Sequence, residues 1–120
     1  MAFVDVFTGD SVSPSELSYR AVALIANATL EWPTLEASVA NAVARIMDVT
    51  PTAGGFTLTM PDARQVSVGA SVLFFNPSAF TFSVLESDGS ALVTIPAGQY
   101  RYIYLTDNTT QGGSWGVNAF

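Results

Sequence analysis

The chain has 120 residues and a mass of 12.7 kDa, and it contains no cysteine, no histidine and, since its four basic residues are all arginines, no lysine. This composition excludes disulfides, Cys- or His-based metal sites, Ser-His-Asp and Cys-His catalytic groups, and the lysines of Schiff bases and phosphate loops. Charged residues are only 12% of the chain, about half of the roughly 25% usual in soluble domains, and the net charge of −6 disfavours nucleic acids and anionic membranes as partners.

The segment from Ser13 to Met47 carries two competing periodicities. A capping-box spacing begins at Ser13, with Pro14 at the first helical position, and apolar residues follow at helical intervals. A two-residue alternation over 19–32 favours a strand instead. We expect strands at about 19–32 and 42–49, with one short helical turn near Pro14 or within 35–41.

The C-terminal half predicts a series of short strands separated by turns. The turns are expected at Asn76-Pro77, at Asp88-Gly89, where a type I′ hairpin is favoured, and at Pro96-Ala97-Gly98. We expect strands at 56–60, 72–75, 80–84, 92–95, 100–105 and 115–117, and core positions for Phe74, Phe75, Phe80 and Phe82.

These elements predict one β domain over 1–120. The expected fold is all-β, a β-sandwich or jelly-roll of about eight or nine short antiparallel strands. The start of the chain lacks the basic region of a secretory signal, and the long uncharged stretch 65–85 is interpreted as two strands around a turn rather than a membrane span.

Carboxylates are the only acid–base groups available, and their scattered positions predict no catalytic pair. We therefore expect no enzyme, no cofactor and no bound metal. Loops 86–90 and 107–109 offer oxygen ligands for calcium, but they lack the spacing of a calcium loop and are better explained as turns.

Three tyrosines alternate along the strand expected at 100–105. Such a row can pack in the core, form a subunit interface or stack on sugar rings, and core packing is the first expectation. The candidate interface residues are Tyr100, Arg101, Tyr102, Tyr104 and Trp115.

Several short stretches together resemble a β-rich module of tailed-bacteriophage virion proteins. They are the segments 55–63, 80–84, 95–99 and 105–110, with Phe75-Asn76, Asp88-Gly89 and Gly113-Ser114-Trp115, and the likeness extends more loosely to 1–7 and 19–48.

The resemblance implies a structural protein on the exterior of a phage particle. Its expected role is an oligomeric domain, commonly a homotrimer, that anchors a tail fibre or appendage, with a tail adaptor or the major capsid protein as partner. Alternatives are a capsid decoration protein that stabilises the head and, from another class, a carbohydrate-binding module that uses Tyr102 and its neighbours.

Overall fold

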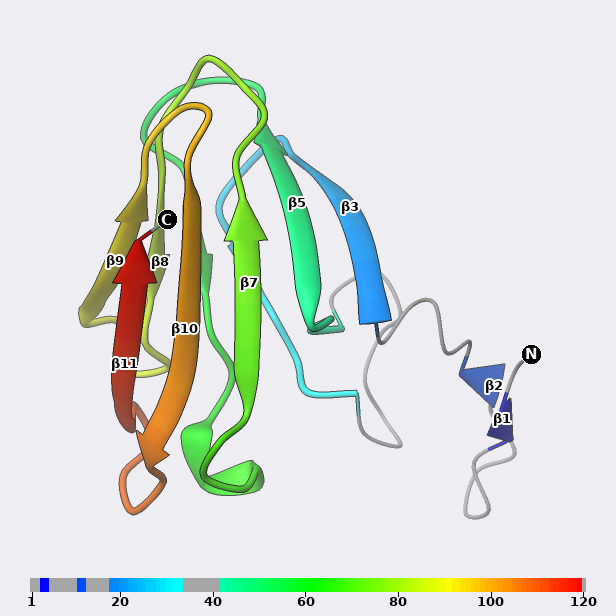
Figure 1. Cartoon of the computed structure of the whole chain (residues 1–120), viewed down its shortest axis with the longest axis vertical. Coiled ribbons are helices and arrows are strands. Elements are labelled where there is room, and N and C mark those ends of the chain that lie inside the picture. The colour runs from blue at the N-terminus through cyan, green and yellow to red at the C-terminus, as the bar shows by residue number, and fades with distance from the viewer. Residues whose placement is uncertain (1–2, 5–10, 13–17, 34–41, 120) are drawn as a thin grey trace.

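The chain is mostly β, and the strands of its described residues form three sheets (Figure 1). The computed structural model describes residues 3–4, 11–12, 18–33 and 42–119. A two-stranded sheet pairs β1 with β2, a five-stranded sheet has the order β11-β10-β7-β5-β3, and a four-stranded sheet has the order β4-β6-β8-β9. The bounds are β1 (Phe3–Val4), β2 (Ser11–Val12), β3 (Tyr19–Leu24), β4 (Ala28–Thr29), β5 (Ile46–Pro51), β6 (Thr57–Thr59), the 3-10 turn η2 (Ala63–Gln65), β7 (Ser71–Phe75), β8 (Phe82–Leu85), β9 (Ala91–Ile95), β10 (Tyr100–Asp107) and β11 (Ser114–Ala119).

From β3 to β8 the chain winds back and forth between the two larger sheets. Each turn of this winding adds one strand to each sheet, so that Tyr19 pairs with Ile46 and Ile46 pairs with Leu73 in parallel register. After β8 the direction reverses, because β9, β10 and β11 each pair antiparallel with a neighbour. The result is a short β-helix-like winding closed by antiparallel strands.

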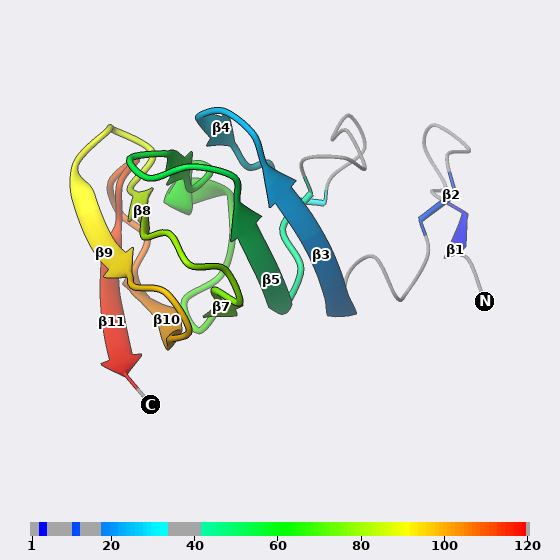
Figure 2. The same cartoon turned by 90° about the horizontal axis from the view of Figure 1, so that it is seen from above.

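The two larger sheets lie face to face and enclose one apolar core (Figure 2). The rings of Phe74 and Phe82, one from each sheet, meet edge to face with centroids 6.4 Å apart. Side chains from both sheets that are almost wholly buried are Met47, Val49, Leu58, Val72, Phe74, Phe82, Val84, Ile95 and Ile103.

The expected antiparallel sandwich or jelly-roll is wrong in strand direction. Four neighbouring pairs run parallel: β3 with β5, β5 with β7, β4 with β6, and β6 with β8. Hydrophobic alternation marks the two faces of a strand but carries no information about the direction of its neighbour. The coarser expectation of a mostly β protein is confirmed.

The strand expectations hold best after residue 55, where each of the six expected strands corresponds to one of β6 to β11. The single strand expected at 19–32 is wrong, because the chain turns over 25–27 and β3 and β4 belong to different sheets. The strand expected at 42–49 begins only at Ile46. The helical turn expected near Pro14 or within 35–41 lies outside the described residues.

Two local expectations are corrected by the turn and core geometry. Phe75 lies half-buried on the outer face of its sheet and Phe80 is 43% exposed, so only Phe74 and Phe82 of the four phenylalanines are core residues. The Asp88-Gly89 hairpin has positive φ at Gly89 alone, and the Gly89 N–H donates to the Glu86 carbonyl. It is therefore a type I turn followed by a left-handed glycine, not a type I′ turn.

Asn76 is the one buried polar side chain among the described residues. Its amide Nδ2 donates to the carbonyls of Phe80 and Ile95, and its Oδ1 accepts from the Ser78 N–H and hydroxyl. These bonds satisfy the whole amide, which removes most of the cost of burying it. Asn76 thereby ties the end of β7 to the loop before β8 and to the end of β9.

Candidate functional site

The outer face of the five-stranded sheet is formed by residues that alternate with the core. Strand register places Tyr19, Ile46, Leu73 and Tyr102 in one row across β3, β5, β7 and β10. A second row contains Asp48, Phe75 and Tyr100. The sheet therefore carries large apolar and aromatic side chains on the face that points away from the core.

Exposure distinguishes this surface, called here the outer face, from the core. Tyr19 is 48% exposed, and Ile46 and Tyr100 are each 42% exposed. Leu73 and Tyr102 are half-buried. A sheet face that meets only solvent is normally polar, and contiguous exposed apolar residues typically mark an interaction site.

The aromatic rings on the outer face support one another. The Tyr100 ring stacks on Phe75 with centroids 4.2 Å apart, and Tyr102 and Tyr104 lie 5.8 Å apart at a tilt of 31°. Tyr104 lies over Gly116, where a Cβ atom would fall 2.1 Å from the tyrosine ring. The rings are therefore held in defined positions before any partner arrives.

A hollow of about 430 Å³ opens on the outer face between β5, β7 and β10. Arg45 stands at its rim and also borders a second, mainly apolar hollow of about 390 Å³. No hydrogen bond or ion pair of the Arg45 side chain occurs within the described part of the chain. Residues around the first hollow are Ser18, Arg45, Ile46, Ser71, Leu73 and Tyr102.

The carboxylate of Asp48 on the outer face is engaged within the chain. The Tyr19 hydroxyl donates to Asp48 Oδ2 at 2.7 Å, and this hydrogen bond to a carboxylate raises the pKa of Tyr19. Asp48 is therefore already partnered, whereas no partner of the Arg45 charge lies among the described residues.

The five residues expected at an interface lie on two different faces of the sheet. Tyr100, Tyr102 and Tyr104 lie on the outer face, so the expectation that the tyrosine row packs in the core is wrong. Arg101 alternates with them and points to the opposite face. Trp115 pairs with Leu105, packs against the core, and donates from its indole N–H to the Gly112 carbonyl. The outer face is completed by Ile46 and its neighbours on β5 and β7, which the sequence does not group with the tyrosines because it does not identify the strands that lie beside β10.

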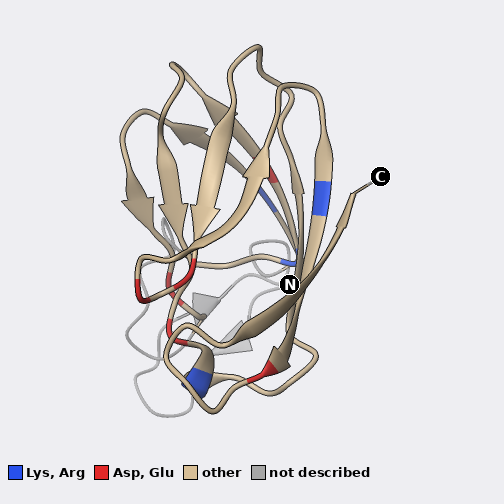
Figure 3. Cartoon of the chain, turned by 90° about the vertical axis from the view of Figure 1, so that its left-hand side faces the viewer, with Lys and Arg blue, Asp and Glu red and all other residues tan. Residues whose placement is uncertain are grey.

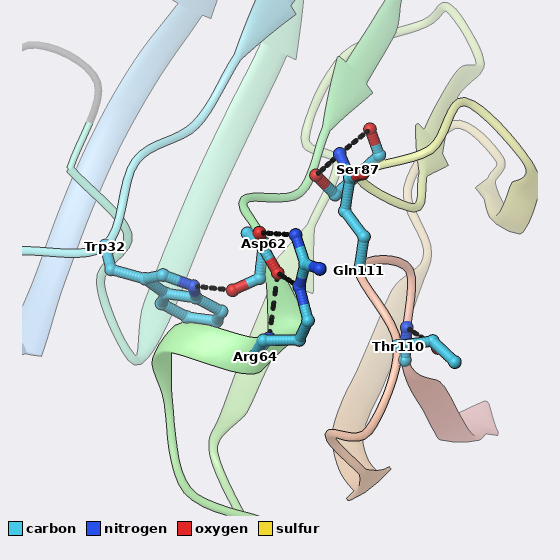
Figure 4. Close-up of polar contacts among 7 residues, drawn as sticks. Trp32, Asp62, Arg64, Ser87, Thr110 and Gln111 are labelled. Atoms are coloured by element: carbon cyan, nitrogen blue, oxygen red, sulfur yellow. Dashed lines mark hydrogen bonds and ion pairs between the residues drawn. The ribbon is translucent and has the colours of Figure 1, made fainter.

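A second candidate region is the end of the sheets near η2, called here the polar end (Figure 4). Arg64 forms an ion pair with Asp62 at 2.7 Å, and the Arg64 backbone N–H also donates to Asp62 Oδ1. The side-chain hydrogen bond from Arg64 is the main cause that lowers the pKa of Asp62. The Trp32 indole N–H donates to the Asp62 carbonyl at 2.7 Å, and this bond joins the segment after β4 to the residue before η2.

Several other polar groups of the polar end are also bonded within the chain. Gln111 Nε2 donates to the Ser87 hydroxyl, and the Asp107 carboxylate accepts from the Thr109 N–H and hydroxyl, which lowers the pKa of Asp107. Asp88 Oδ1 accepts from the Ser90 N–H. The loops considered for calcium thus use their oxygens for turns. Within the described residues no group of three or more acidic side chains is arranged to hold a metal ion.

Charged residues gather in the loops at the polar end and are sparse along the strands (Figure 3). A hollow of about 500 Å³ at this end is lined by polar residues such as Thr29, Asp62 and Gln65 together with apolar ones such as Leu30 and Met60. The polar end therefore consists mainly of turns closed by their own hydrogen bonds. The outer face instead exposes apolar and aromatic side chains beside Arg45, whose side chain has no hydrogen bond or ion pair within the described residues.

Comparison with known proteins adds no assignment, since no family model, curated protein or solved structure matches the chain. Among the described residues, none of the helical segments has the length and apolar character needed to cross a membrane.

Proposed function

We propose that this chain is a non-catalytic structural protein on the exterior of a tailed-phage particle, where it docks on another virion protein through its outer face. The observation that carries the docking surface is the pair of rows that, except for Asp48, are apolar or aromatic on a sheet face where polar side chains are the norm. The virion assignment is supported by the sequence resemblance and by the low charge density, which suits a surface partly covered by other protein.

The outer face specifies the chemistry of its partner. The rigid tyrosines and Ile46 require a flat apolar protein surface, because tyrosine buries a large area at little entropic cost. Arg45 at the rim of the hollow requires a carboxylate opposite it, since an arginine left without a partner in an interface is costly. We therefore expect a virion protein that presents an acidic side chain within an apolar patch.

Two sites on the particle fit this proposal, and copy number separates them. An anchor for a tail fibre or appendage occurs in tens of copies per particle, whereas a capsid decoration protein occurs in hundreds. We favour the anchor because the resemblance is to appendage modules. Quantitative mass spectrometry of purified particles from the strain that encodes the chain distinguishes the two.

A carbohydrate-binding role is less well supported by the same tyrosines. Tyr100 already stacks on Phe75 and Tyr104 lies over Gly116, so among these three tyrosines Tyr102 alone borders the open hollow. A sugar site normally combines an aromatic ring with several free polar groups. Glycan-array binding that is lost in Tyr102→Ala would favour this alternative.

The docking surface is tested by replacing Arg45 in the particle. We expect Arg45→Glu to lower the amount of chain in purified particles at least tenfold, because it sets a carboxylate against the partner's carboxylate. Arg64→Gln is the matched control, since Arg64 is paired with Asp62 at the polar end, and it should leave incorporation unchanged.

Footprinting provides a second readout. Hydroxyl-radical labelling should modify Tyr100 and Tyr102 in the isolated chain and much less in particles. Absence of the chain from particles would refute the virion role, and equal labelling of the tyrosines in both states would refute the docking surface.

A further inference from the structure

β11 ends the five-stranded sheet with an edge that lacks the usual protection against pairing. The strand contains no charged residue and no proline, and its ladder with β10 is regular from Trp115 to Ala119. The only register shift in this pair lies at Ser114, where the strand begins. No strand of the described residues pairs with the other edge of β11. Natural edge strands usually carry charges, prolines or bulges, because an open edge is a template for another strand.

The hydrogen bonds of β10 show which backbone groups of β11 face this open edge. The Leu105 N–H donates to the Ala70 carbonyl, and the Leu105 carbonyl accepts from the Gly69 N–H. Both backbone groups of Leu105 therefore point toward the β7 side and away from β11. In an antiparallel pair the direction alternates, so residues 104 and 102 bond to Gly116 and Asn118. The N–H and C=O groups of Trp115, Val117 and Ala119 therefore face outward.

These three outward residues are symmetric about Val117. We propose that two copies of the chain pair antiparallel along β11, with Val117 opposite Val117 of the second copy and Trp115 opposite Ala119. Each of the three pairs then exchanges both of its backbone hydrogen bonds. A two-fold axis at Val117 satisfies every outward group of the edge with one repeated strand, which identifies a second copy as the occupant.

The side chains of β11 favour the same arrangement. Val117 is 42% exposed, and a second Val117 opposite it covers this apolar side chain. Each chain carries a net charge of −6, so copies repel one another over most of their surface, but this edge brings no charged side chain of the strand against its counterpart.

The other two sheet edges that are comparable in length are less suited to pairing. The β8–β9 ladder contains a register shift between Val84 and Leu85, and Pro96 follows β9 directly. β3 carries Arg20, whose guanidinium donates to the Ala42 carbonyl. Bulges, prolines and charges are devices that block edge pairing.

Pairing along β11 would join two five-stranded sheets into one continuous sheet and place both outer faces on the same side. The inference deepens the proposed function, because a dimer presents two docking surfaces to the particle at once. After one surface binds, the other is held near its own site, and this high effective concentration strengthens the overall binding. The pairing itself rests on the backbone of β10 and β11, and it is measured on the isolated chain.

The test is the mass and dissociation constant of the purified chain by sedimentation equilibrium from low micromolar to millimolar concentration. We expect a reversible dimer of twice 12.7 kDa. Val117→Pro should weaken the dimer at least about 30-fold, because it removes an outward N–H from each copy while leaving the bonds from β11 to β10 intact. Thr94→Pro is the matched control, because the Thr94 N–H also points to an open edge, the edge of β9. Ser83 lies opposite Thr94 and donates its N–H to the Phe56 carbonyl on the β6 side, so this pair exchanges no backbone hydrogen bonds between β8 and β9.

If Val117→Pro unfolds, two further experiments still test the pairing along β11. Val117→Lys sets two like charges opposite each other and should produce a folded monomer, whereas Val117→Thr should preserve the dimer. Amide exchange by NMR should slow for Trp115, Val117 and Ala119 as concentration rises. A wild-type chain that stays monomeric or forms a trimer, or a dimer that Val117→Lys leaves intact, overturns the pairing without bearing on whether the chain occurs in particles.

Discussion

The two faces of β10 differ in what their side chains contact, although the residues alternate one by one. Ile103 and Leu105 are almost wholly buried between the sheets, whereas Tyr100, Tyr102 and Tyr104 lie on the outer face. Both sets are apolar or aromatic. Hydrophobic side chains therefore have two roles on one strand: the inner residues stabilise the fold, and the outer residues remain accessible at the surface.

The strongest test of this comparison replaces neighbours on opposite faces. Ile103→Ala should lower the free energy of unfolding by about 3 kcal/mol, because it leaves a cavity between the sheets. Tyr102→Ala should cost about 1 kcal/mol, since the ring is only half-buried. Urea unfolding measures both values. Equal losses would show that the outer face contributes to stability as the core does.

Asn76 tests whether a polar side chain is tolerated among the buried residues only when its hydrogen bonds are complete. Asn76→Ala should cost about 2 to 3 kcal/mol, because the carbonyls of Phe80 and Ile95 lose their donor in a buried place. Asn108→Ala, which removes one bond to the Val66 carbonyl, should cost about 1 kcal/mol. Chemical denaturation of both variants ranks them, and the reverse order would contradict the explanation.

Gly116 tests the packing of the outer face itself. Gly116→Ala should destabilise the chain by about 1.5 kcal/mol, because its Cβ would collide with the Tyr104 ring. In a Tyr104→Ala background the same substitution should cost less than about 0.5 kcal/mol, since the colliding ring is gone. A double-mutant cycle measured by thermal unfolding gives the coupling. No coupling between the two sites would mean that Tyr104 does not rest on Gly116.

The smallest effect is expected at the polar end, away from both faces of β10. Burial and, secondarily, Asp88 raise the pKa of Glu86, so ionisation of Glu86 is less favourable in the folded chain than in the unfolded one. Its contribution to stability is present at low pH and is lost as pH rises above about 4. Glu86→Gln should raise the midpoint of thermal unfolding by about 1 °C at pH 7 and leave it unchanged near pH 3.

Asp62 supplies the opposite sign as a control for this pH dependence. Its pKa is lowered by Arg64, so its stabilising contribution is present at neutral pH and is lost as pH falls through the lowered value. Asp62→Asn should therefore be less stable than wild type at pH 7, and the difference should shrink toward acid pH. A parallel response of the two variants to pH would contradict these assignments.

The sequence was informative where a single strand and its turns carry the signal. Alternation and turn residues locate the six strands from β6 to β11, and the expected core positions of Phe74 and Phe82 are confirmed. The 19–32 segment failed because its alternation continues through the turn at 25–27. An uninterrupted period of two does not reveal that the chain crosses from one sheet to the other.

The candidate site was located only in part from the sequence. The tyrosine row was recognised as a candidate interface, but its companions Ile46 and Leu73 come from strands far away in the chain. Arg101 is a neighbour of the tyrosines in sequence and Trp115 is aromatic like them, which is why the sequence suggests one group. The strand register places both residues on the other face.

The mostly β character of this protein, its lack of cysteine, histidine and lysine, and the positions of most of its later strands can be read from the amino-acid sequence alone. The fold is needed to show which face of β10 is covered, which strands run parallel, and that β11 ends its sheet without a further partner among the described strands. The physical reason is that periodicity is a property of one strand, whereas burial and edge exposure depend on which strands lie beside it.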